Sequence, residues 1–167
     1  MAHPLHLTIT VDVLASEAEL TPAEATVWQA ARAATNHAYA PYSHFHVGAA
    51  LLLEDGSVFR GNNQENAAYP SGLCAERTAL FGWAASQPAQ RIVGMAVAAR
   101  PANGEFTLAW PCGACRQVMT EYEHRQQHPI PLLLPGPDGT IYRYRSVGDL
   151  LPFSFSAENL PTPQPIV

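Results

Sequence analysis

The chain has 167 residues, 47% of them hydrophobic, and a formal net charge of −5. This length and apolar content predict one globular domain with a substantial core and exclude an intrinsically disordered chain. The nine basic residues are all arginines, and they are scattered between Arg32 and Arg145 without a basic run. Proteins that grip a polynucleotide usually carry a clustered basic face, so the charge pattern favours a small-molecule substrate.

The three cysteines cannot form a complete set of disulfides, and thiols kept reduced for a metal are typical of the cytosol. Residues 1–13 lack the cationic start and the continuous apolar stretch of a signal peptide. No segment approaches the roughly 20 apolar residues that span a bilayer. We therefore expect a cytoplasmic protein.

The first predicted element is a strand over residues 5–13, where apolar and polar residues alternate with the period of two of a half-buried strand. A helix is expected to follow. Thr21 is a suitable N-cap, Pro22 suits the first helical position, and Glu24 completes a capping box. The alanine-rich run after Glu24 is predicted to stay helical to about Tyr39, because Pro41 stops the helix.

The remaining elements are predicted from periodicity and from turn residues. In chain order they are a hairpin of residues 47–53 and 57–62, a helix from Cys74 to about Ser86, a strand over 91–99, a helix from 112 or 113 to about 125, a hairpin of 131–134 and 140–145, and a helical turn over 147–151. This order predicts an α/β protein, a three-layer α/β/α sandwich around a five-stranded mixed sheet.

All three cysteines fall in two short motifs, Cys74-Ala75-Glu76 and Pro111-Cys112-Gly113-Ala114-Cys115. Each motif lies at the predicted start of a helix, where free N–H groups and the helix dipole lower the pKa of a thiol. Cys112 and Cys115 are three residues apart and therefore share a helical face. Three thiolates leave the fourth position of a tetrahedral zinc ion open, as in a catalytic zinc site. We predict one zinc ion per chain.

Glu76 is the predicted proton carrier. Zinc lowers the pKa of a bound water from about 15.7 to about 7, and a neighbouring carboxylate can take that proton and pass it on. Zinc with three thiolates is formally −1, and this excess would weaken the metal as a Lewis acid. Arg77 and Arg116 each follow a ligand directly, and we expect both to donate hydrogen bonds to ligand sulfur atoms.

The alternative interpretation is a structural zinc site, which normally has four protein ligands. His124 and His128 have a metal-like i, i+4 spacing, but Pro129 indicates that the helix is ending there, so a solvated helix end is favoured. Three cysteines beside a glutamate that is not a ligand are a signature of zinc deaminases. A purely structural site is therefore the weaker hypothesis.

The chain resembles the cytidine deaminases, specifically the small homotetrameric type with three cysteine ligands. Four motifs in consistent order carry the resemblance, and a fifth segment from Leu150 to Phe155 adds to it. The four motifs are Ala40–Ala50, Gly61–Pro70, Cys74–Ala79 and Pro111–Gln117. The match covers about residues 25–160, and four motifs in register are far more specific than one.

This resemblance implies a set of nucleoside-binding residues. Asn63 and Glu65 would hydrogen-bond the ribose hydroxyls, Phe45 would line the pocket, and Ala75 would offer backbone groups to the pyrimidine. Phe155 would reach the base bound by a neighbouring subunit, so that a homotetramer shares its active sites. The structural alternatives are a turn residue for Asn63, a solvated carboxylate for Glu65, and core packing for the two phenylalanines.

Three features depart from the family pattern. Trp110 stands where a small residue is usual, and it would narrow or shield the metal pocket. Phe153 replaces the usual glycine, which leaves open whether Phe153 or Phe155 reaches the neighbour. Residues 1–20 look like an extension with an extra strand, and a local edge strand is favoured over packing between subunits. We therefore expect a catalytic domain over residues 21–160 and a loose tail over 161–167.

The resulting hypothesis is zinc-dependent hydrolytic deamination of free cytidine and 2′-deoxycytidine to uridine and 2′-deoxyuridine, with release of ammonia, as in pyrimidine salvage. It implies a small nucleoside as partner, and neither a nucleic-acid polymer nor a membrane. The alternatives are a deaminase of another small substrate such as blasticidin S, a polynucleotide deaminase, and a non-enzymatic zinc or interaction module. The complete pair of Asn63 and Glu65 favours a nucleoside, and the missing basic patch argues against a polynucleotide.

Overall fold

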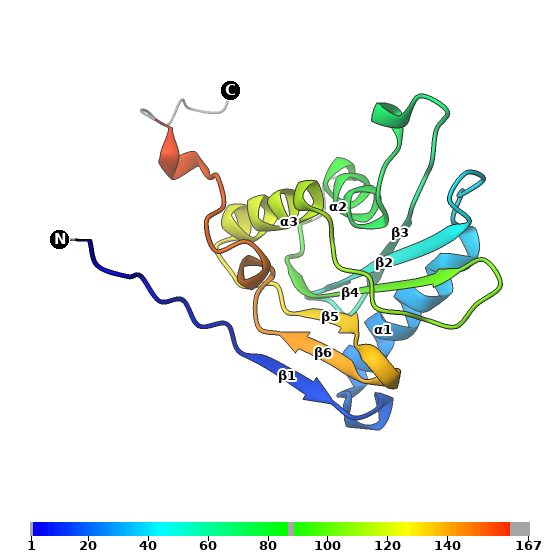
Figure 1. Cartoon of the computed structure of the whole chain (residues 1–167), viewed down its shortest axis with the longest axis horizontal. Helices are drawn as coiled ribbons and strands as arrows, with labels where there is room; N and C mark the ends of the chain where they lie inside the picture. The colour runs from blue at the N-terminus through cyan, green and yellow to red at the C-terminus, as the bar shows by residue number, and fades with distance from the viewer. Residues whose placement is uncertain (1, 87–88, 161–167) are drawn as a thin grey trace.

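The computed structural model describes residues 2–86 and 89–160, so the tail predicted over 161–167 lies outside the described residues. A six-stranded sheet separates one helix from two others, which confirms the predicted α/β/α sandwich (Figure 1). The elements in chain order are β1 (Val11–Leu14), α1 (Pro22–Ala34), β2 (Phe45–Leu53), β3 (Val58–Asn62), α2 (Ala75–Ala85), β4 (Ile92–Pro101), α3 (Gly113–Gln126), β5 (Leu132–Pro135) and β6 (Ile141–Tyr144).

The sheet is mixed, with the strand order β1-β6-β5-β4-β2-β3. β4 and β5 pair in parallel, and α3 forms the crossover between them. β3 and β4 are each antiparallel to β2, so they run in the same direction. Their carboxyl ends therefore lie at the same edge of the sheet, and α2 and α3 both begin there. This topology brings the two cysteine motifs together.

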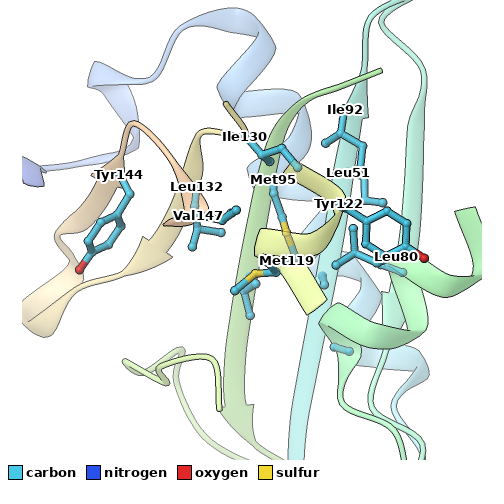
Figure 2. Packing of buried hydrophobic residues seen from close by; sticks show 14 of the residues in the cluster. Leu51, Leu80, Ile92, Met95, Met119, Tyr122, Ile130, Leu132, Tyr144 and Val147 are labelled. Atoms are coloured by element: carbon cyan, nitrogen blue, oxygen red, sulfur yellow. The ribbon is translucent and has the colours of Figure 1, made fainter. Parts of the chain in front are cut away.

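Apolar side chains fill both faces of the sheet. On the face covered by α2 and α3, Leu51, Met95 and Leu132 pack against Leu80 and Met119 of the two helices (Figure 2). A second cluster on the opposite face packs α1 through Val27, Trp28 and Ala31. Successive residues of a strand point to opposite faces, so one strand serves both clusters. The two helices that carry the cysteine motifs are thus held by a continuous core.

The N-terminal strand is shorter than predicted, and it makes the sheet six-stranded rather than five-stranded. β1 begins at Val11, whose partner Tyr144 is the last residue of β6. Residues before Val11 run on past the end of β6 (Figure 1), and Leu5, Leu7 and Ile9 are exposed. The alternation of apolar residues was correctly identified, but a strand also needs a hydrogen-bonding neighbour. β1 does lie at the edge of the sheet, as the favoured interpretation required.

The first helix begins as predicted and ends earlier. Thr21 and Glu24 form the capping box, with Thr21 Oγ1 accepting from the Glu24 N–H at 3.3 Å and Glu24 accepting from the Thr21 N–H at 2.9 Å. α1 stops at Ala34, and a single 3₁₀ turn follows instead of a helix to Tyr39. Arg100 of β4 donates to Thr35 and Asn36, and this long-range contact favours the tighter turn. None of the helices in the described part of the chain has the length and apolar character of a membrane span.

Gly61 of β3 sets the distance between the sheet and α2. A Cβ at this position would lie 2.4 Å from the backbone nitrogen of Ala79 and 2.8 Å from the carbonyl oxygen of Ala75. Gly61→Ala should therefore push α2 away from the sheet and destabilise the protein by about 1–3 kcal/mol or more. Thermal unfolding is the measurement. At roughly 2–4 °C per kcal/mol for a chain of this size, we expect the Tm to fall by about 2–12 °C. Gly94→Ala is the control, because its nearest neighbour, Leu52, lies at an ordinary 3.7 Å. Equal Tm values for the two variants would contradict this account.

Candidate active site

The three cysteine side chains converge at the amino ends of α2 and α3. Cys74 is the N-cap of α2, Cys112 is the N-cap of α3, and Cys115 lies in the first turn of α3. The Sγ atom of Cys112 is 3.9 Å from that of Cys74 and 3.5 Å from that of Cys115. Sulfur ligands about 2.3 Å from a tetrahedral zinc ion lie about 3.8 Å apart, so these spacings fit zinc.

The electrostatic surroundings favour the thiolate form of Cys74. Hydrogen bonding to Cys115 and then to Arg77 lowers the pKa of the Cys74 thiol to about 5, although burial opposes this shift. The contact with Cys74, together with burial, raises the pKa of Cys115. Metal binding requires deprotonated sulfur, so Cys74 is the ligand most readily available to a zinc ion at neutral pH.

The two arginines that follow ligands have different partners. Nη2 of Arg77 donates to Sγ of Cys74 at 3.7 Å, as predicted. Arg116 instead donates to two backbone carbonyls, that of Pro111 at 2.8 Å and that of Leu150 at 3.3 Å. The expected hydrogen bond from Arg116 to sulfur is therefore not the contact that the structure shows. Arg116 ties the segment before Cys112 to the turn over Val147–Leu150.

Glu76 is buried beside the sulfur atoms, with 4% of its surface exposed. It lies in the first turn of α2, two residues after Cys74. Burial raises the pKa of this carboxyl above its usual range, and the negative charge on Cys74 acts in the same direction. A carboxyl group with a raised pKa can hold a proton as well as release it, which general acid–base catalysis requires.

Within residues 2–86 and 89–160, the three cysteines form a cluster that no fourth His, Asp or Glu joins. His124 lies about 14 Å farther along α3 than Cys115, at 1.5 Å per residue, and His128 lies beyond the end of this helix. His128 is exposed and contacts the carbonyl of Pro129. The donor set therefore leaves one zinc position open to solvent or substrate.

A cleft of about 660 Å³ leads to the cysteines, and Glu65 and Asn63 line it as well. One carboxylate oxygen of Glu65 accepts from the backbone N–H groups of Tyr42 at 2.9 Å and Ser43 at 3.2 Å. These contacts, the Ser43 hydroxyl foremost, lower the pKa of Glu65, so it carries a negative charge. Its other oxygen is available to a ligand.

The side chain of Asn63 is fixed against β2. Its Oδ1 accepts from the Val47 N–H at 2.9 Å, and its Nδ2 donates to the Phe45 carbonyl at 2.9 Å. An amide oxygen has two lone pairs and an NH₂ group has two hydrogens, so each atom retains capacity for one more partner. Asn63 is thus both a structural link to β2 and a candidate ligand-binding group.

The remaining predicted residues separate into two groups. Phe45 and Ala75 line the cleft, together with Arg77 and Glu76. Phe155 lies elsewhere, with 60% of its surface exposed, and Phe153 is also exposed. Gln117 of α3 holds the backbone of Phe155 through two hydrogen bonds, one to its carbonyl at 2.7 Å and one from its N–H at 3.3 Å.

The cleft also contains two tyrosines to which the sequence assigned no binding role, together with the tryptophan that was expected to narrow or shield the metal pocket. Tyr42, Tyr69 and Trp110 all line it. Tyr42 and Tyr69 both fall inside motifs of the resemblance, so the sequence could have indicated both. Tyr69 lies in the loop between β3 and α2. Gln64 anchors this loop by exchanging two backbone hydrogen bonds with Leu73, each 2.9 Å long.

A zinc site with an open position beside a buried carboxyl defines a hydrolytic metal centre, and comparisons with known proteins specify its family. The family model described as the cytidine and deoxycytidylate deaminase zinc-binding region matches residues 22–127. The chain is 47% identical over 126 residues to a cytidine deaminase of Halalkalibacterium halodurans, covering 74% of this chain and 86% of that one. It is 40% identical over 124 residues to a cytidine deaminase of Mycobacterium tuberculosis, covering 74% and 83% of the two chains.

Structural comparison agrees with these matches. The crystal structure of a cytidine deaminase from Burkholderia pseudomallei has a TM-score of 0.66 and 43% sequence identity, and the match covers 78% of this chain and 97% of that chain. The chain therefore belongs to the cytidine deaminase family, and its three-cysteine cluster is a zinc site.

Proposed function

We propose that the protein deaminates free cytidine and 2′-deoxycytidine hydrolytically, giving uridine or 2′-deoxyuridine and ammonia. The observation that carries this proposal is the buried Glu76 carboxyl beside three converging sulfur atoms, at the end of a cleft that also holds Asn63 and Glu65. The relatives in which these motifs occur are cytidine deaminases, which supports the same substrate class.

Glu76 would move the protons of the reaction. When bound, zinc supplies a Lewis acid that makes water a nucleophile at neutral pH. The Glu76 carboxylate accepts one proton from the attacking water and delivers it to the ring nitrogen. It then takes the second proton of that water, from the hydroxyl now on the ring carbon, and delivers it to the amine, which leaves as ammonia. Because burial raises its pKa, Glu76 can carry the proton through both transfers.

The far end of the cleft would select a nucleoside. Glu65 has one free carboxylate oxygen and Asn63 has spare donor and acceptor capacity, and together they suit the vicinal hydroxyls of a ribose. Phe45 offers an apolar ring to the pyrimidine, and the buried backbone of Ala75 offers polar groups to the edge of the base.

Ammonia release tests the substrate directly. We expect turnover of cytidine and of 2′-deoxycytidine, and none of a single-stranded oligonucleotide. The kinetics should be insensitive to salt, because polynucleotide binding depends on phosphate contacts and this chain has no clustered basic residues. Preferential turnover of blasticidin S, or a folded zinc protein without activity on any nucleoside, would overturn the proposal.

Arg77 would reduce the excess negative charge of the site through its contact with Cys74. Arg77→Gln should lower kcat/KM by roughly 10–100-fold while zinc remains near one ion per chain. The measurement combines steady-state kinetics with metal analysis. Arg116→Gln is the comparison, because Arg116 contacts backbone carbonyls and its loss should act mainly on thermal stability. Unchanged kinetics for Arg77→Gln would remove this role.

We also propose a homotetramer in which Phe155 reaches the substrate of a neighbouring subunit. Both phenylalanine rings are exposed, but Gln117 anchors the backbone of Phe155, and this anchoring supports the role for Phe155 over Phe153. Co-expression of Glu76→Gln with Phe155→Ala should restore activity above that of either variant alone, since mixed oligomers contain sites with both residues intact. Purely additive activities would indicate that each chain carries a complete site. We further propose that residues 21–160 form the catalytic domain and that the protein is cytoplasmic.

A further inference from the structure

Trp110 lines the cleft that leads to the cysteines. It is the second residue before Cys112, in the segment that joins β4 to α3, and it lines the cleft beside Cys112. The substrate-binding groups Asn63 and Glu65 belong to a different segment, the loop between β3 and α2. Trp110 and Cys112 thus line the same cleft, two residues apart in the chain.

Two tyrosines of β6 hold the indole in place. The Trp110 ring centroid lies 5.8 Å from that of Tyr142, with an interplanar angle of 36°. It lies 6.2 Å from that of Tyr144, with a nearly perpendicular angle of 76°. Both spacings fall in the range of attractive aromatic pairs. Tyr144 is itself buried, so this support is part of the core.

The backbone around Trp110 is also restrained. The following residue, Pro111, limits Trp110 to extended conformations, and the Pro111 carbonyl accepts from Nε of Arg116 at 2.8 Å. Trp110 is therefore held through both its ring and its backbone. A side chain fixed in this way has a defined shape that a substrate must fit, although 44% of its surface is exposed.

We propose that Trp110 is a specificity-determining residue that limits the size of the pyrimidine at the positions next to the reacting carbon, which are C5 and the amine nitrogen. This inference rests on the proposed cytidine deamination. The reacting carbon must approach the open zinc position, so its neighbouring substituents face the part of the cleft that the indole fills. Asn63 and Glu65, the proposed ribose-binding groups, come from the separate segment between β3 and α2, so we expect the indole to leave selection at the ribose unchanged.

The kinetic test uses cytidine, 5-methylcytidine and N4-methylcytidine with the zinc-loaded parent, Trp110→Ala and Trp110→Phe. One methyl group in a pocket is worth about 10–200-fold in discrimination. We expect Trp110→Ala to raise kcat/KM for either methylated substrate, relative to cytidine, by about tenfold or more. Trp110→Phe keeps a ring against Tyr142 and should give a smaller rise. The ratio of cytidine to 2′-deoxycytidine should not change. If kcat/KM for the methylated substrates, relative to cytidine, is the same in both variants as in the parent, the proposal is overturned.

Fluorescence gives a second readout that does not depend on turnover. Of the three tryptophans, Trp28 packs on the opposite face of the sheet and Trp83 packs against Tyr122, so Trp110 is the one placed to report a ligand in the cleft. Uridine should change the emission of the zinc-loaded parent and of Trp83→Phe, and this change should disappear in Trp110→Phe. A signal that survives in Trp110→Phe would contradict the assignment. A parent that binds uridine but does not deaminate cytidine would refute the proposed function alone.

Discussion

Glu76→Gln should reduce kcat by about 10²–10⁴-fold and leave zinc bound at one ion per chain. Gln has nearly the same size as Glu, and it cannot accept and return a proton near neutral pH. Glu76 is 4% exposed and is not one of the three metal ligands. Removing its carboxylate should therefore stop proton transfer without releasing the metal. Ammonia release from cytidine and metal analysis of the same preparation measure both parts.

Glu121→Gln is the matched control for this substitution, because Glu121 lies on the exposed side of α3 and loses the same charge. It should have parental kinetics. A Glu76→Gln protein with near-parental turnover would show that another group moves the protons. A variant that loses zinc would show that Glu76 supports the metal instead.

Cys115→Ser should abolish both zinc binding and activity, since it leaves two thiolates where a catalytic zinc needs three protein ligands. Cys115 is completely buried within the first turn of α3, so no other side chain can take its place without moving that helix. Metal that binds only the folded state also stabilises it. The Tm of the variant should therefore fall to that of the parent after treatment with a chelator.

Met119→Leu separates loss of the metal from disturbance of the core around α3. Met119 is also fully buried, and an exchange of Met for Leu conserves volume and usually changes stability by less than about 1.5 kcal/mol. This variant should keep its zinc and its activity. Zinc retained at full occupancy in Cys115→Ser would mean that the ligand set has been assigned wrongly.

The structure agrees with the sequence wherever the relevant interactions are short-range. The capping box of Thr21 and Glu24 depends on residues three apart, and it forms as expected. The turn chemistry of Gly136–Gly139 joins β5 to β6 as a hairpin. Cys112 and Cys115 share a helical face because of their spacing, and the observed sulfur distance of 3.5 Å follows from it.

The structure differs from the sequence-based predictions where residues far apart in the chain determine the end of an element or the partner of a side chain. β1 is short because β6 ends at Tyr144, and the alternation before Val11 contains no information about that end. α1 stops at Ala34 beside Arg100, which is 65 residues beyond Thr35 in the chain. Arg116 has the same position relative to a ligand as Arg77, yet the turn over Val147–Leu150 attracts its guanidinium away from sulfur.

By itself, the sequence determined the zinc ligands, the adjacent carboxyl and the class of fold, because residue type and local spacing encode them directly. The tertiary structure alone decided that Glu76 is buried, that Asn63 is bound to β2, and that Trp110 rests on two tyrosines of β6. Burial and packing depend on residues that are far apart in the chain and meet only when the sheet assembles. For that reason, the pKa of Glu76 and the shape of the cleft beside the metal followed from the fold and not from the motifs.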